Sequence, residues 1–199
     1  ILGSRSSSEF AEVPAGIGGG WDGFRGTPRL VRSFQYRDNE SPKADEILDK
    51  RGIFFDKNRS VDITTSVTGT FTTEGWAVYK YTNLQSNGEP GKNTTFPDTD
   101  FPMFRLGDVY LMYAEAVARG GEGGDLATAV NYINALRERA YGDTYHNITE
   151  SWLLENNLQN ILDERCRELY WEGVRRTDLI RFGLYTSPNY LWTFKGGVL

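Results

Sequence analysis

Three glutamates with helical spacing are the first candidates for chemistry in this sequence. Glu164, Glu168 and Glu172 recur every four residues, so they share one face of a helix. Paired carboxylates would suit general acid–base work, as in glycoside hydrolysis. Arg165 and Arg167 lie between them, and an adjacent guanidinium lowers the pKa of a carboxyl group. We therefore expect these carboxylates to be paired ions and poor proton donors.

The alternative interpretation is a structural network of ion pairs between helices. In this network Glu115 would project toward Arg137 or Arg165. Its expected members are Glu115, Arg137, Arg165, Glu168 and Glu172. No catalytic residue is predicted, and a glycoside hydrolase fragment is disfavoured because it would need two unpaired carboxylates in a cleft.

Aromatic residues give a better indication of function, since Phe, Trp and Tyr make up 14% of the chain. The apolar C–H face of a sugar packs on a flat ring, and its hydroxyls require polar side chains beside that ring. Two stretches combine both features, and their candidate residues are Trp21, Asp22, Arg25, Trp76, Tyr79, Tyr81 and Asn83. These residues could instead have structural roles. Trp21 would then pack the irregular segment onto the helices, and one face of the alternating stretch 76–81 would belong to the core.

The scarcity of cysteine and histidine excludes several classes of site. Cys166 and His146 are the single residues of their types, which excludes a Cys/His zinc site and an intrachain disulfide. His146 lies between two helical patterns and outside a nucleophile-elbow context, which disfavours catalysis there.

Two groups of oxygen ligands resemble metal sites only weakly. The first group is Asp56, Asn58, Ser60 and Asp62, which lacks the glycine and the bidentate glutamate of a calcium loop. The second is Asp98 and Asp100, which are typical of turn residues before a helix. No metal or cofactor is predicted.

Charge and hydropathy exclude other partners. The 22 basic residues are outnumbered by 27 acidic ones, giving a net charge of −5, and neither half is basic, so a nucleic-acid partner is not expected. No apolar run reaches the about 20 residues that span a bilayer. The chain opens without Met or a signal peptide, and we expect it to be a fragment of a longer protein.

The character of the sequence changes near residue 100. Residues 1–100 are rich in Gly, Thr and aromatics and form an irregular segment, the candidate ligand-facing region; residues 101–199 are helical. The early segment predicts a short helix over Pro28–Phe34, strands at 52–56 and 61–65, and extended chain at 76–81. The helices expected after it are Phe104–Arg119, Asp125–Ala140, Thr149 or Trp152 to Trp171, and Thr177–Phe182. The fold class is therefore mostly α.

The first two long helices resemble a tetratricopeptide-like hairpin, with small residues that allow close packing. One hairpin does not bury its apolar face unaided, so the rest of the chain or a missing segment must cover it.

Three helical segments resemble the signatures of the SusD/RagB family in order and spacing. They are Asp100–Ala116, Ala129–Arg139 and Ile161–Gly183. The stretches at 20–25, 49–51 and 79–83 agree more loosely. Gly107 departs from the alanine usual in the family, which predicts a cost to the helix of about 0.5–1 kcal/mol.

This resemblance implies a non-catalytic protein of the outer membrane that is lipid-anchored at the cell surface of Bacteroidetes-type bacteria. Such proteins capture oligosaccharides, of starch or other glycan type, for a SusC-like TonB-dependent transporter. The anchor itself is absent from this chain. An interaction module of tetratricopeptide type with a protein or peptide ligand remains the alternative, although no further repeats are present.

Overall fold

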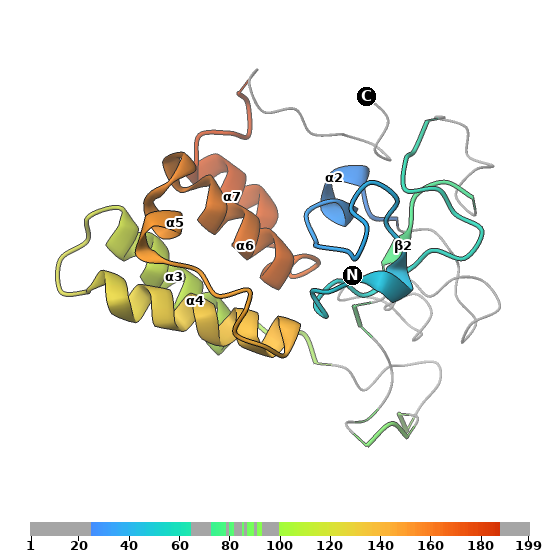
Figure 1. Ribbon diagram of the computed structural model, residues 1–199, viewed down its shortest axis with the longest axis horizontal. Helices are drawn as coiled ribbons and strands as arrows, with labels where there is room; N and C mark the ends of the chain where they lie inside the picture. The colour runs from blue at the N-terminus through green and yellow to red at the C-terminus, as the bar shows by residue number, and fades with distance from the viewer. Residues whose placement is uncertain are drawn as a thin grey trace. The chain divides into compact units, whose positions relative to one another are not determined.

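The computed structural model describes residues 25–64, 73–78, 80, 81, 85, 87–89, 91, 92 and 100–187. Helices dominate these residues, with two short strands among them, as the mostly α prediction expected (Figure 1). The chain divides into two compact units. The first comprises Ile1–Ile47, Gly52–Phe101 and Trp192–Leu199, and the second comprises Leu48–Arg51 and Pro102–Leu191.

The second unit is built on a helical hairpin of α3 (Leu106–Ala118) and α4 (Leu126–Tyr141). Asp125 caps α4 by accepting a hydrogen bond from the backbone N–H of Thr128. Gly142 ends α4 in the left-handed conformation, with φ of 83°. The hairpin and the start of α4 are as predicted, although α3 begins two residues later than Phe104.

The predicted third helix is wrong as a single element. It is divided into α5 (Glu150–Leu154), the 3-10 turn η3 (Asn156–Leu158) and α6 (Gln159–Leu169). All three residues of η3 have φ between 50° and 62°. Asparagine tolerates this left-handed conformation better than most residues, so the pair Asn156 and Asn157 interrupts the helix.

The last helix, α7, covers Arg175–Arg181, close to the predicted position. Buried residues from α3, α4, α5 and α6 form the core of this unit. At its edge the rings of Tyr110 and Tyr132 stack at a centroid distance of 4.3 Å. None of the helices in the described ranges is long and apolar enough to cross a membrane.

The described residues of the first unit contain little regular structure. They form the short helix α2 (Pro28–Val31), the 3-10 turn η1 (Ala44–Glu46) and two antiparallel strands, β1 (Phe54–Phe55) and β2 (Ala77–Val78). The strand predicted at 52–56 is therefore reduced to Phe54–Phe55. In the extended stretch predicted at 76–81, Ala77–Val78 forms a strand, and residue 79 lies outside the described residues. Residues 61–64 of the other predicted strand are irregular, and residue 65 lies outside the described residues.

A short segment of the N-terminal half belongs to the helical unit. In Leu48–Arg51, the backbone N–H of Lys50 donates to the carbonyl of Ala140 at 3.0 Å. The hydroxyl of Tyr170 donates to the carbonyl of Arg51 at 2.8 Å. This segment carries Asp49 and Arg51 into contact with α6.

Candidate functional site

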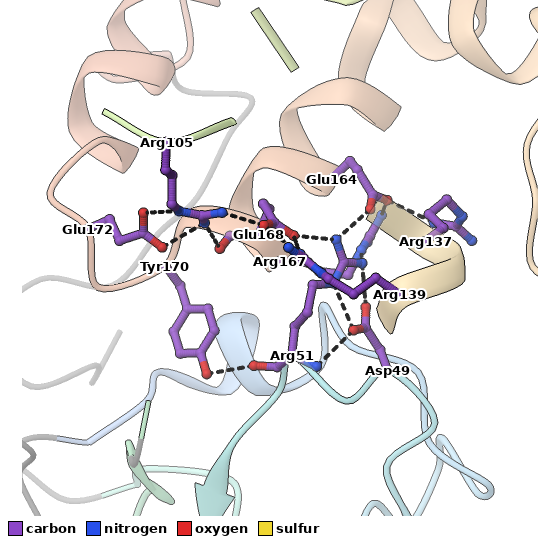
Figure 2. A network of polar contacts seen from close by, with 10 residues as sticks. All are labelled: Asp49, Arg51, Arg105, Arg137, Arg139, Glu164, Arg167, Glu168, Tyr170 and Glu172. Carbon is purple, nitrogen blue, oxygen red and sulfur yellow. Dashed lines mark hydrogen bonds and ion pairs between the residues drawn. The ribbon is translucent and has the colours of Figure 1, made fainter. Parts of the chain in front are cut away.

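The carboxylates of α6 lie within a dense network of arginines (Figure 2). Glu164 is fully buried. Its Oε1 accepts from Arg51 Nη1 at 2.7 Å, and its Oε2 accepts from Arg137 at 2.8 Å and from Arg167 at 2.6 Å. Burial alone would raise the pKa of Glu164, but the charges of Arg167, Arg51 and Arg137 hold it well below its usual range. This carboxylate is therefore ionised and fully engaged.

Glu168 and Glu172 are held in the same way. Glu168 accepts from Arg51, Arg105 and Arg139. Burial raises its pKa, but hydrogen bonds from Arg139 and Arg105 and the charge of Arg51 lower it to about 2. Arg105 also binds Glu172 through two hydrogen bonds, of 2.6 and 2.7 Å. These groups hold the helices and the inserted segment together, and none is free to transfer a proton at neutral pH.

A second cluster of ion pairs joins α3, α6 and α7. Arg165 binds Asp108 and Asp178, each at 2.9 Å. Glu115 binds Arg181 and Arg119. Burial raises the pKa of Glu115, and hydrogen bonds from these two arginines outweigh it and lower that pKa.

The expected partner of Glu115 was wrong. It contacts neither Arg137 nor Arg165, because Arg137 is paired with Glu164 and Arg165 faces α7. The expected structural network is present in a different pairing: each of its five predicted members forms an ion pair.

Two of the predicted aromatic candidates are buried in the first unit. The Trp76 side chain is 2% exposed, and its ring lies 5.8 Å from Tyr36 and 6.1 Å from Phe54. Tyr81 is 8% exposed and packs against Phe101. In this structure neither ring is a surface platform, because Trp76 and Tyr81 are both buried.

Arg25 also serves the local fold, since its Nη1 donates to the carbonyl of Glu74 at 2.9 Å. The remaining predicted ligand residues lie outside the described part of the chain: Trp21, Asp22, Tyr79 and Asn83.

The first unit contains a cleft of about 230 Å³. It is lined by Arg32, Phe34, Gln35, Tyr36, Asn39 and Pro42. The lining combines buried rings with exposed groups that can hydrogen-bond. The Tyr36 hydroxyl donates to the carbonyl of Val31, and the Tyr36 backbone N–H donates to Asn39 Oδ1 at 2.8 Å. The cleft is thus held rigidly on the side of Tyr36.

Sequence reasoning missed this cleft. A signal was available in the sequence, because the apolar residues Phe34 and Tyr36 flank the polar Gln35, an alternation typical of extended chain. The structure buries both rings and exposes Gln35. The predicted helix over Pro28–Phe34 concealed that pattern.

The minor candidates for chemistry have ordinary structural roles. His146 bonds Asp143 Oδ1 at 2.9 Å and stacks on Tyr141. Asp56 accepts the backbone N–H of Ala44, and Asp62 pairs with Arg32.

No group of three or more His, Cys, Asp or Glu residues suited to a metal occurs among the residues that the structure describes. Asp98 lies outside those residues, and Asp100 is exposed.

Comparison with known proteins gives a consistent result. The model of the SusD family matches residues 56–197. The chain is 44% identical over 128 residues to the starch-binding protein SusD of Bacteroides thetaiotaomicron, covering 64% of this chain and 21% of that protein. It is 42% identical over 82 residues to a SusD-like protein of Formosa agariphila, covering 41% of this chain and 15% of the relative.

The fold is also found in a solved structure. A SusD superfamily protein from Bacteroides vulgatus aligns with a TM-score of 0.55 at 24% identity, over 88% of this chain and 37% of that protein. The chain therefore spans about a fifth or less of the curated relatives and just over a third of this structure.

Proposed function

The chain belongs to the SusD family, and we propose that it takes part in non-catalytic binding of starch-type or other oligosaccharides at the cell surface. In this proposal the full protein is lipid-anchored in the outer membrane and passes its ligand to a SusC-like TonB-dependent transporter. The starch-binding relative supports the class of ligand. The carboxylates of α6 are ionised and paired with arginines, so they are not available as proton donors for hydrolysis, which supports a binding role.

The observation that carries this proposal is the cleft of the first unit. Sugar hydroxyls require donors and acceptors at fixed positions, and sugar C–H groups require an apolar wall. Gln35 and Asn39 supply exposed amides, and Arg32, which also pairs with Asp62, supplies a guanidinium; the rings of the lining, Phe34 and Tyr36, are largely buried behind them. The volume lies below the about 300–1,000 Å³ of drug-sized pockets, so the cleft suits one sugar unit of a longer chain.

The aromatic candidates enter the proposal in two roles. We propose that Trp21, Asp22, Tyr79 and Asn83 contact the ligand directly. Trp76 and Tyr81 act as support, because Trp76 packs on Tyr36, which lines the cleft. Arg25 holds the neighbouring backbone of Glu74.

Calorimetric titration of the 199-residue chain with maltoheptaose tests the proposal. The double variant Arg32→Ala/Gln35→Ala removes two exposed groups of the cleft and is expected to weaken binding about tenfold or more. Arg37→Ala is the matched control, since it removes an exposed arginine outside the lining. Trp21→Ala is expected to weaken binding as well.

Failure of maltoheptaose and of a panel of other glycans to bind would reject glycan capture by this chain. Unchanged affinity in the double variant would keep glycan binding and move the site away from the cleft.

A protein or peptide ligand is the second candidate, as for a tetratricopeptide-like module. One observation favours it: five apolar residues leading into and along α3 are between 46% and 86% exposed. They are Met103, Phe104, Leu106, Val109 and Met112. An exposed apolar surface of this kind is typical of a contact with another chain. Amphipathic helical peptides would be titrated next, with Phe104→Asp as the variant expected to lose them.

A further inference from the structure

The loop between α4 and α5 presents the most exposed aromatic side chain among the large hydrophobic residues described. Tyr145 is 90% exposed. A single exposed tyrosine is ordinary on a protein surface. The loop that carries Tyr145, however, is held to α4 by several side-chain hydrogen bonds.

Side chains of α4 fix the backbone of this loop. Asn134 accepts from the N–H of Ile148 at 2.7 Å and donates to its carbonyl at 3.2 Å. Arg137 Nε donates to the carbonyl of His146. Glu138 accepts from the Asn147 amide at 2.7 Å. The loop is therefore anchored to α4 at the three residues that follow Tyr145.

The ring of Tyr145 is also oriented by its neighbours. The His146 ring stacks on Tyr141 at 3.9 Å with 8° between the planes. The Tyr145 ring meets His146 edge to face, at 5.4 Å and 81°. Arg137 lies over the Tyr141 ring at 5.3 Å. An aromatic ring held in this way loses little conformational freedom when a ligand packs on it.

A carboxylate accompanies the ring. Asp143 accepts from the backbone N–H of Tyr145 and from His146 Nδ1, each at 2.9 Å and both through Oδ1. Its side chain is 48% exposed, so the carboxylate is accessible to a ligand. The hydrogen bond from His146 lowers the pKa of Asp143, so the acceptor stays ionised.

We infer that Tyr145 and Asp143 form a second glycan-contact site, on the helical unit. One sugar ring packs its C–H face on Tyr145 while a hydroxyl donates to Asp143. The ligand class rests on the proposed function; the position of this site is independent of the cleft.

Calorimetric titration of the 199-residue chain with maltoheptaose tests this inference. Tyr145→Ala is expected to weaken binding by roughly tenfold, the upper end of what aromatic contacts contribute. Tyr145→Phe keeps the ring and is expected to bind within about twofold of the parent. Ile180→Ala is the control, because Ile180 is an exposed apolar residue of the same unit, 54% exposed, and lies outside both proposed binding surfaces. Thermal melting checks folding, which loss of an exposed ring leaves unchanged.

The outcomes separate the inference from the proposed function. Binding by the parent with no loss in Tyr145→Ala overturns the inference and leaves glycan capture standing. Equal losses in Tyr145→Ala and Ile180→Ala overturn it too, since they would reflect exposed apolar area in general. If the parent binds no glycan at all, the proposed function fails and the inference fails with it.

Discussion

Gly107 lies directly against the carboxylate of Glu168. A Cβ at residue 107 would stand 2.8 Å from Glu168 Oε1 and 2.5 Å from Arg105 Nη1. Glycine in a helix costs about 0.5–1 kcal/mol relative to alanine, which is the cost predicted from the sequence at this position. The structure supplies a reason for accepting it: the ion pair of Arg105 and Glu168 occupies the space of a methyl group.

Gly107→Ala is therefore expected to destabilise the protein by about 1 kcal/mol despite the better helix propensity of alanine. In an Arg105→Ala background the closer of the two contacts is removed while Glu168 remains, so the same change is expected to destabilise by less than in the parent. Urea denaturation of the four proteins in this cycle measures both effects. Stabilisation by Gly107→Ala in the parent would show that the network shifts freely.

Glu164 is the buried centre of three arginines, so its charge is expected to matter strongly. Glu164→Gln keeps the size of the side chain but removes the negative charge that balances the positive charges of Arg51, Arg137 and Arg167. We expect a loss of about 3–5 kcal/mol in the free energy of unfolding. The exposed Glu122→Gln is the control and should change it by less than about 0.5 kcal/mol. A similar small effect at both positions would argue against a stabilising network.

The depressed pKa of Glu168 predicts a sensitivity to acid. Its folded pKa of about 2 lies below the ordinary value of 4.5. The unfolded state therefore binds the proton first, and the stabilisation is complete above pH 4.5. It is lost as the pH falls from 4.5 toward 2, by up to about 3 kcal/mol for this group.

Urea midpoints between pH 7 and pH 3 measure this loss. Glu168→Gln is expected to flatten the acid limb while lowering stability at pH 7. An equally steep acid limb in the variant would assign the effect to other carboxylates.

The break between α5 and α6 depends on backbone conformation at Asn157, whose φ is 50°. Asn157→Ala is expected to destabilise by about 1 kcal/mol, because alanine disfavours this region. Asn157→Gly should be neutral or slightly stabilising. Asn131→Ala makes the same change at an exposed position inside α4 and should stabilise slightly. Equal effects of the two alanine changes, measured by thermal melting, would contradict this account.

The helices of the second unit were predictable because each carries its own local signals. Asp125 and Gly142 mark the two ends of α4, and the apolar spacing of Ile133 and Leu136 marks its buried face. The network was partly predictable as well, since arginines beside the glutamates of α6 indicated ion pairs. Which arginine meets which glutamate was not, as the wrong partners expected for Glu115 show.

The family, the mostly α fold and the pairing of the α6 carboxylates with arginines could all be predicted from the sequence. Three features became visible only in the folded chain: Arg51 joins Glu164 across 113 positions, Trp76 is buried, and Tyr145 is exposed. The physical reason is that helix signals act within a few residues. Burial and ion pairing between distant segments depend on which surfaces meet once the chain has folded.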